Sequence, residues 1–278
     1  MPGLLRVLTA RDLDEVRALL ARDPVRHCFV ASRLASGDLD PWQLGGELWG
    51  YVEDDVLQSA LYAGANLVPV ATSDAARAAF ADRCRRIGRR CSSIVGAAAE
   101  VLDLWRLLEP AWGPAREVRS RQPLMVCDSA PAVAADPAVR RVREDELDLL
   151  VPACVAMFTE EVGVSPLAGG AAAAYRARIL ELVRTGRAFA RIDGDRVVFK
   201  AEVGAVGAGA CQVQGVWVDP ALRGRGLSAP GMARVVQYCR QDIEPLVSLY
   251  VNDFNTPARK AYLQVGFREV GDFATVLF

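Results

Sequence analysis

Hydrophobic and polar residues alternate in short stretches of this chain and recur at helical spacing in others. In the first half, residues 10–21 carry leucine and valine three and four positions apart, which predicts a helix. Residues 47–62 contain two apolar stretches joined by an acidic turn at 53–55, which predicts paired strands. The other elements predicted in this half are strands near 67–71, 92–95 and 123–127 and helices at 75–87 and 98–108.

The second half repeats this order of elements. Its strands at 188–192 and 196–203 meet at an Asp-Gly-Asp turn, a composition typical of hairpins. The other predicted elements are helices at 144–158, 170–185, 228–240 and 257–265 and strands at 210–218, 246–251 and 268–278. Both halves therefore predict a mixed α/β fold, and their shared order indicates a duplicated fold with a degenerate first copy.

A segment rich in alanine and proline separates the two halves. Residues 128–138 show no apolar periodicity, and their two prolines favour extended conformations. We therefore divide the chain into an N-terminal domain at 1–130, a linker at 131–138 and a C-terminal domain at 139–278.

Charge and cysteine content exclude several classes of function. The chain has 278 residues with 33 basic and 34 acidic side chains, so nothing favours nucleic acid as a partner. Seven cysteines without CxxC spacing do not form the pattern of a disulfide framework or a zinc site. No apolar run approaches the ~20 residues of a membrane span, and no secretory signal is present, so we expect a cytoplasmic protein without a membrane partner.

The clearest chemical signal is the segment Val-Trp-Val-Asp-Pro-Ala-Leu-Arg-Gly-Arg-Gly-Leu-Ser at residues 216–228. A strand ends at its Asp-Pro step, and a helix begins at its last residue. Free amide groups and the helix dipole favour an anion there, and Gly224 and Gly226 allow phosphate oxygens close to the backbone. Arg223 and Arg225 add positive charge, so the segment predicts a diphosphate site. The spacing matches neither a dinucleotide-binding fingerprint nor a P-loop.

This segment resembles the acyl-CoA-binding signature of the GNAT N-acetyltransferases, Gln/Arg-x-x-Gly-x-Gly/Ala, with Ala221 at the first position. A second segment is similar to the later motif of that family: Leu-Tyr-Val-Asn at 249–252, then Asn255, Tyr262 and Gly-Phe at 266–267. The resemblance covers roughly residues 140–278. It implies the acyl-CoA N-acyltransferase fold, and the two halves together are similar to tandem GNAT proteins.

The resemblance also implies which residues bind acetyl-CoA. The strand that ends at Val218 is expected to separate from the strand near Leu249, which frees backbone groups for the pantetheine arm. The residues predicted to contact the cofactor are Val216, Trp217, Val218, Arg223, Gly224, Arg225, Gly226, Leu227, Ser228 and Asn255. Asn255 also stands where it could simply cap a helix.

Catalytic roles follow from the same resemblance and from the residues available. Tyr262 is the expected proton donor to the departing thiolate, with a core tyrosine as the alternative. The lone histidine lies outside the matched half, so Glu202 is the first candidate for the base. The alternative is a solvent-facing strand carboxylate paired with Lys200 or an arginine. Gln212 and Gln214 stand where many family members carry glutamate; with Tyr250 they are expected to contact the substrate.

We therefore predict an N-acetyltransferase that transfers the acetyl group of acetyl-CoA to a primary amine by direct attack, without a metal. The acceptor is a small-molecule or protein amine, and the protein is a monomer or a homodimer. The alternative is an acyl-CoA-binding sensor without turnover. Aminoacyl transfer is a third option, but the near-neutral charge argues against a tRNA-sized partner.

Overall fold

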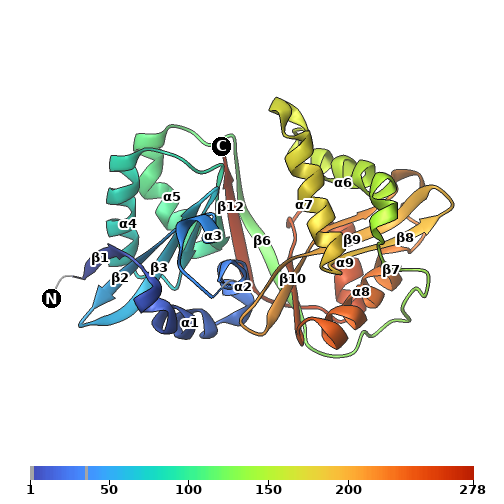
Figure 1. Cartoon of the computed structure of the whole chain (residues 1–278), viewed down its shortest axis with the longest axis horizontal. Coiled ribbons are helices and arrows are strands. Elements are labelled where there is room, and N and C mark those ends of the chain that lie inside the picture. Colours follow the sequence, from blue (N-terminus) through green and yellow to red (C-terminus); the bar gives the residue numbers. More distant parts are fainter. Residues whose placement is uncertain (1–2, 35–36) are drawn as a thin grey trace.

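The protein is described by a computed structural model that covers residues 3–34 and 37–278. The first two residues of the predicted N-terminal domain lie outside the described residues. One continuous sheet of 12 strands runs through the molecule, and two similar α/β halves lie next to each other along it (Figure 1). The predicted mixed α/β fold with two related halves is confirmed.

The N-terminal half contributes its elements in the order that the sequence predicts, with three additions. The additions are β1 (Leu4–Val7), α2 (Pro24–Arg33) and α3 (Pro41–Leu44). The others are α1 (Leu13–Ala21), β2 (Gly46–Glu53), β3 (Val56–Gly64), β4 (Asn66–Val70), α4 (Asp74–Ile87), β5 (Ser93–Ala97), α5 (Ala98–Trp112) and β6 (Glu117–Cys127). Ser73 caps α4, because its hydroxyl accepts a hydrogen bond from the amide of Ala76.

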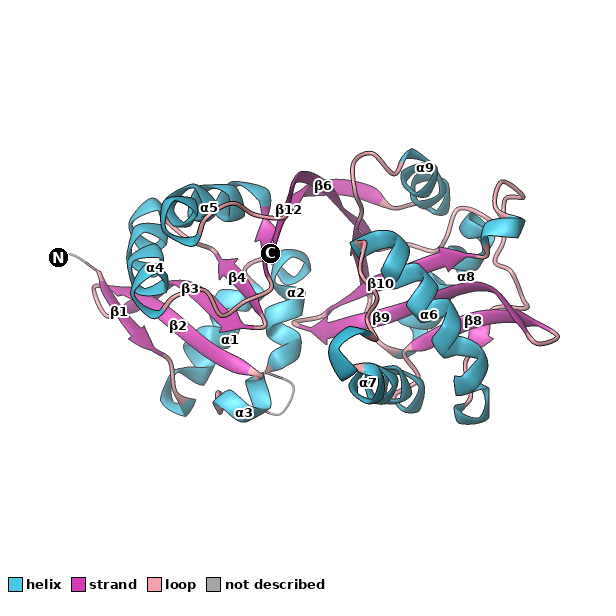
Figure 2. Ribbon diagram, turned by 90° about the horizontal axis from the view of Figure 1, so that it is seen from above, coloured by secondary structure: helices cyan, strands magenta, loops and turns pink. Residues whose placement is uncertain are grey.

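The C-terminal half adds only the two-residue strand β7 (Arg140–Arg141) to the predicted elements. The others are α6 (Leu147–Val162), α7 (Ala172–Arg184), β8 (Ala188–Asp193), β9 (Arg196–Gly207), β10 (Ala210–Val218), α8 (Ser228–Asp242), β11 (Leu246–Tyr250), α9 (Thr256–Val265) and β12 (Arg268–Leu277). Figure 2 shows α6 and α7 over one side of this half, with α8 on the other side of β8–β10.

The two halves exchange their last strands. The strand order is β1-β2-β3-β4-β5-β12-β6-β11-β10-β9-β8-β7, so β12 pairs with β5 and β6 pairs with β11. Gln122 of β6, 2% exposed, accepts a hydrogen bond from Thr275 of β12 and donates one to Asn252. Each half of the sheet therefore contains a strand from the other side of the predicted linker, and the domain bounds drawn at 131–138 stay a prediction.

Helix α2 forms a second connection between the halves. The thiol of Cys28 contacts the carbonyl oxygen of Ala210 at 3.3 Å, and both residues belong to one small buried cluster with Ala205. A Cβ on Gly207 at the end of β9 would lie 2.6 Å from the backbone of Ala31, so the hairpin of β9 and β10 approaches α2 closely. This contact fixes the base of the strand that carries the candidate site.

Candidate functional site

Strands β10 and β11 separate partway along their length. Their parallel pairing begins at Ala210 with Leu246 and ends at Gln212 with Ser248. Within the described residues, no strand pairs with residues 213–218 of β10 on that side. The separation of these strands that the family resemblance implied is confirmed, and we refer to the unpaired side of residues 213–218 as the strand opening.

A β-bulge lies in β10 beside the strand opening. Pairing with β9 shifts between Gln214, which faces Glu202, and Trp217, which faces Lys200. Gly215 within the bulge has φ +59°, and a Cβ there would lie 3.0 Å from Met157 Cε and 3.1 Å from Lys200 Nζ. Only glycine fits this close approach and this backbone conformation, and the bulge redirects the end of β10.

A buried ionic cluster lies beneath the bulge. The Lys200 ammonium, fully buried, donates a hydrogen bond to the Glu202 carboxylate, and the Cys154 thiol lies 3.3 Å from Glu202 Oε1 and 3.4 Å from Lys200 Nζ. Burial alone would raise the pKa of Glu202, but the adjacent ammonium outweighs it and lowers that pKa. Glu202 is 4% exposed. A carboxylate that is buried, paired with Lys200 and held as a weakly basic anion does not favour the base role of Glu202, which stays a prediction.

The loop that follows β10 presents backbone donors without acceptors. Asp219 caps the short turn at Pro220–Leu222 by accepting from the amide of Ala221 at 2.9 Å. Within the described residues, the amides of residues 224–229 have no hydrogen-bond acceptor. Gly224 and Gly226 both have φ +75°, and nothing lies within 4 Å of a Cβ built at either position. This array of free donors at the start of α8 is an anion site by its own geometry.

The two loop arginines differ in their contacts. Arg223 forms two hydrogen bonds of 2.7 Å with the carboxylate of Glu160 on α6, and its Nε donates to the carbonyl of Val218. Arg225 is exposed and has no ion pair or hydrogen bond within the described residues. Arg223 is thus committed to holding the loop against α6, whereas Arg225 is available to an anion. Leu227 precedes the helix without a side-chain cap, and Ser228 opens it.

Two tyrosines lie on β11 and on α9, the helix that follows it. Tyr262 of α9 is 6% exposed, and burial together with the charge of Glu161 raises its pKa. Tyr250 ends β11, is 36% exposed and has a pKa raised to about 12 by the surrounding protein and by Glu161. Both phenols therefore stay protonated at neutral pH and can only donate a proton, which agrees with the role predicted for Tyr262 without testing it.

The remaining predicted residues are divided between the site and the core. Val216 and Val218 pack their side chains against the core under α8 and α9, which leaves their main chain at the strand opening. Trp217 packs against the core under α6 and α7. Asn255 caps α9 by accepting from the amide of Ala258 at 3.3 Å, so the alternative of a helix cap is present in the structure.

The two glutamines alternate along β10 with Cys211 and Val213, which belong to the core under α8 and α9. Gln212 and Gln214 therefore lie on the opposite face of the strand. Gln212 is 8% exposed, and Gln214 is half-buried beside Gly204. A Cβ on Gly204 would lie 2.1 Å from Gln214 Oε1, so the missing side chain makes room for the amide. The contact of Gln212, Gln214 and Tyr250 with a substrate stays a prediction.

Two carboxylates at the end of α6, Glu160 and Glu161, were not among the residues that the sequence predicted for the site. Glu160 holds the loop through Arg223, and Glu161 raises the pKa of both tyrosines. A signal was present, because the apolar face of this helix recurs at 147, 150, 154 and 157 and the next position in that spacing is Glu161. An acidic residue in line with a buried stripe marks a special position.

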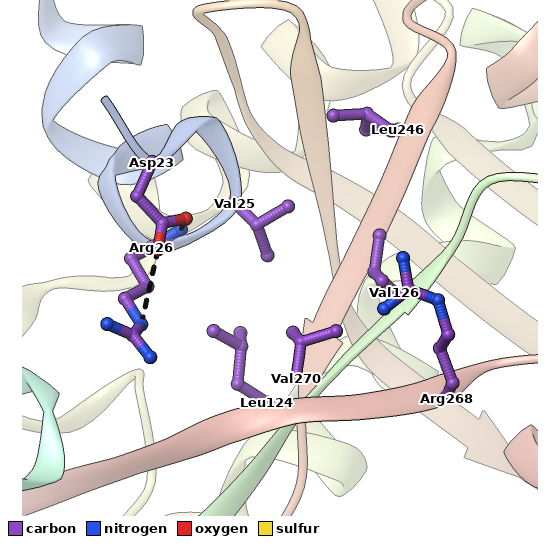
Figure 3. A pocket seen from close by; sticks show the side chains of 8 residues that line it. All are labelled: Asp23, Val25, Arg26, Leu124, Val126, Leu246, Arg268 and Val270. Atoms are coloured by element: carbon purple, nitrogen blue, oxygen red, sulfur yellow. Dashed lines mark hydrogen bonds and ion pairs between the residues drawn. The ribbon is translucent and has the colours of Figure 1, made fainter. Parts of the chain in front are cut away.

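A pocket lies elsewhere, where α2 meets the exchanged strands (Figure 3). It has a volume of about 220 Å³, and its lining is Asp23, Val25, Arg26, Leu124, Val126, Leu246, Arg268 and Val270. In Figure 3 Asp23 and Arg26 pair with each other at its edge. None of the predicted site residues lines it, so it is a feature of the junction between the halves.

No group of three or more histidine, cysteine, aspartate or glutamate side chains within the described residues has the arrangement of a metal site. Among the same residues, no helix has the length and apolar character needed to cross a bilayer.

Comparison with known families identifies the class of the C-terminal half. Residues 173–267 match the model of the acetyltransferase (GNAT) family, and residues 46–150 match a domain family of unknown function, DUF4081. The C-terminal half of this chain is therefore similar to the GNAT acetyltransferase family over residues 173–267. No curated protein matches the chain.

Solved structures extend this result to the fold of the whole chain. A Drosophila protein matches with TM-score 0.67 at 15% identity, and a GNAT-family acetyltransferase from Colwellia psychrerythraea matches with TM-score 0.59 at 10% identity. Each match covers 99% of both chains. A tandem GNAT protein from the clavulanic acid biosynthesis pathway matches with TM-score 0.51 at 15% identity, over 99% of this chain and 98% of that one. The chain thus has the tandem GNAT fold.

Proposed function

We propose that this protein is an N-acetyltransferase that uses acetyl-CoA and acetylates a primary amine. The observation that carries the proposal is the row of free amides at residues 224–229, which lies directly after an unpaired strand end. A diphosphate needs several converging donors, and a pantetheine arm needs unpaired backbone groups. The C-terminal half offers both in consecutive residues.

The loop and the strand opening would bind different parts of acetyl-CoA. The amides of 224–229 and the Arg225 guanidinium would hold the diphosphate, with the positive end of α8 behind them. Main-chain groups of Val216 and Val218 would pair with the amides of the pantetheine arm, as a strand would. Arg223 acts indirectly, because its pairing with Glu160 holds the loop in position.

Tyr262 and a backbone amide near Val218 would act on the thioester of bound acetyl-CoA. Bound acetyl-CoA supplies a thioester carbonyl carbon that a neutral amine attacks. The Tyr262 hydroxyl, kept protonated by its raised pKa, would donate to the departing sulfur. An amide near Val218 would polarise the carbonyl oxygen.

Calorimetry with acetyl-CoA tests the binding part of this proposal. We expect acetyl-CoA to bind at least 10-fold more tightly than acetyl-pantetheine, which has the same thioester and arm but no diphosphate, because the loop contacts are then lost. Equal affinity for the two compounds would contradict the assignment of the loop.

Release of the CoA thiol tests turnover. The acceptors are ethanolamine, spermidine, lysine, kanamycin and a lysine-containing peptide, each added to protein and acetyl-CoA. With any acceptor that works, Tyr262→Phe should lower kcat about 100-fold and leave the affinity for acetyl-CoA unchanged. An unchanged kcat would remove Tyr262 from the mechanism.

A second function, an acyl-CoA sensor, is favoured by one observation. Glu202 is locked in an ion pair, and glutamines occupy the neighbouring face of β10, so β9 and β10 offer no free base. A sensor would bind acetyl-CoA with the same preference over acetyl-pantetheine but release no thiol with any amine of the panel.

A further inference from the structure

Helix α6 directs one carboxylate at the strand opening. Its face toward the sheet carries Cys154, which contacts Lys200 and Glu202, and then Met157, whose Cε lies close to the Gly215 bulge. Glu161 follows Met157 by four residues, so it lies on the same face one turn further along. The stripe that packs on the bulge therefore ends in an acid where β10 has no partner.

The end of α6 is held from two sides. Arg119 of β6 donates to the backbone oxygen of Glu161 at 2.7 Å, and Arg116 donates to the backbone oxygen of Val162 at 3.1 Å. From the other side, Glu160 forms its two hydrogen bonds with Arg223 of the anion-binding loop. Glu161 thus lies between the exchanged strand and the loop, at the mouth of the strand opening.

The Glu161 carboxylate is free while its neighbours are occupied. Within the described residues its oxygens have no hydrogen bond and no ion pair, and the side chain is exposed. Arg119 uses its side chain on Glu117, and Lys200 uses its ammonium on Glu202. A carboxylate in this position can exchange protons with a bound molecule.

The charged and titratable groups that act on Glu161 come from its own helix and from four other elements, β6, β9, β11 and α9. Desolvation by the protein atoms around the carboxylate raises its pKa, although the residue keeps contact with solvent. Arg119 of β6 and Lys200 of β9 oppose that shift, and Glu160 adds to it. Tyr250 of β11 and Tyr262 of α9 complete the set. A carboxylate with a raised pKa is a stronger base than an ordinary surface glutamate.

Resting on the proposed function, we propose that Glu161 is the catalytic base that takes the proton from the acceptor ammonium. The first proton leaves the amine nitrogen for a Glu161 oxygen and passes to solvent, which frees the lone pair. The new C–N bond forms as the C–S bond breaks, and the second N–H proton replaces the one that Tyr262 gives to sulfur. The balance is one amide, one thiol and one released proton.

The experiment is a kcat/KM profile against pH for the wild type, Glu161→Gln and Glu161→Asp, with the first acceptor that supports thiol release. The wild-type profile should rise with pH through the pKa of Glu161, above the ordinary glutamate value, because only the carboxylate accepts a proton. Glu161→Gln should lose at least 100-fold at pH 7 and lose that limb. Its defect should shrink near pH 10, where the amine deprotonates unaided.

Controls separate a chemical role from a structural one. Asp148→Asn removes an exposed carboxylate of the same helix, 84% exposed and paired to Arg176, and should leave the profile unchanged. Glu161→Asp should restore part of the rate, and both Glu161 variants should bind acetyl-CoA as the wild type does. Full activity of Glu161→Gln with an active wild type would overturn this role alone, as would a loss that does not vary with pH. An inactive wild type would overturn the proposed function and this role together.

Discussion

In both halves of the molecule two parallel strands separate partway along their length. In the C-terminal half the backbone donors that follow the opening have no acceptor among the described residues, whereas the protein itself occupies them in the N-terminal half. Pairing of β4 with β5 ends at Leu67 and Ile94, just as pairing of β10 with β11 ends at Gln212 and Ser248. After the unpaired strand end, the next α-helix begins at Asp74 in the N-terminal half and at Ser228 in the C-terminal half. The separation of parallel strands is therefore a property of this fold and does not by itself make a binding site.

The difference lies in what satisfies the turn before each helix. In the N-terminal half, the Glu100 carboxylate accepts from the amide of Thr72 at 2.8 Å and from its hydroxyl at 2.6 Å. Ser73 caps α4, and Arg77 donates to the carbonyl of Thr72. In the C-terminal half the corresponding donors at 224–229 have no acceptor. In the N-terminal half, the Glu100 carboxylate therefore accepts the hydrogen bonds that a phosphate could accept in the C-terminal half.

The hairpins next to the two openings share one irregularity in their pairing but carry different residues beyond it. In both halves the hairpin carries an irregularity at the same register, between the pairs Tyr51–Ser59 and Val52–Leu57 and between Arg191–Phe199 and Ile192–Val197. Counting on from it, Lys200 and Glu202 take the places of Ala60 and Tyr62. The bulge at Gly215 in β10 has no counterpart in the pairing of β4 with β3.

The largest expected effect comes from breaking the ionic cluster that only the C-terminal half has. Lys200→Met leaves the Glu202 carboxylate buried without its counter-charge and should lower the free energy of unfolding by about 3–5 kcal/mol. Combining it with Glu202→Leu removes both charges and should restore stability to within about 1 kcal/mol. Urea denaturation measures both effects.

Tyr62→Phe at the corresponding position of the N-terminal half serves as the comparison. It removes one hydroxyl whose partners are the carbonyls of Leu44 and Gly45, and about 1 kcal/mol should be lost. If Lys200→Met were as mild, the Glu202 carboxylate would be free to reach solvent, and the base role predicted for it would gain support.

The next effect concerns the open turn. Gly224→Asp places a carboxylate and a Cβ among the free amides, and the affinity for acetyl-CoA should fall more than 100-fold by calorimetry. The matched control is Gly88→Asp, because Gly88 ends α4 with the same φ of +75° and has no atom within 4 Å of a Cβ. Both variants place a residue with a side chain at positive φ, at a cost of at least about 1–2 kcal/mol, but only one lies at the loop.

The control also decides how a loss of affinity is interpreted. An equal loss in both variants would mean that strain transmitted through the shared sheet weakens binding. Unchanged affinity in Gly224→Asp would mean that the diphosphate lies elsewhere.

Local features of the fold were predictable because their causes are local. The loop at 216–228 holds its strand end, its glycines and its helix start in consecutive residues, so its geometry could be predicted before the fold was known. Helix α2 was missed although Asp23 and Pro24 supply a cap and a first-turn proline, because its ten residues mix apolar with charged positions.

Long-range features were not predictable from the same patterns. Alternation shows which face of a strand is buried but not which strand lies beside it, so the exchange of β6 and β12 left no signal. The burial of Glu202 was not predictable for the same reason, since the cluster that buries it includes Cys154, 48 residues away. Glu161 becomes relevant only once α6 is placed on β10.

The smallest expected effect concerns an arginine–carboxylate pair that is present in both halves. In the N-terminal half, Arg6 holds the Asp12 carboxylate with two hydrogen bonds of 2.8 and 2.6 Å, and that carboxylate also accepts from the amide of Thr9. In the C-terminal half, Arg140 holds Glu146 at 2.7 and 2.6 Å, and Glu146 accepts from the amide of Arg143. These contacts lower the pKa of each carboxyl to about 2, against the opposing effect of burial.

A lowered pKa means that each carboxylate stabilises the fold above the pKa of its unfolded form, near 4, and that this contribution is lost as the pH falls toward 2. Asp12→Asn and Glu146→Gln should therefore each lower the free energy of unfolding by about 1–2 kcal/mol at pH 7. The difference from the wild type should narrow steadily between pH 4 and pH 2 in urea titrations. Because the two halves share this device, the two variants should behave alike. A deficit that stays constant with pH would show that the side chains contribute by packing and not by charge.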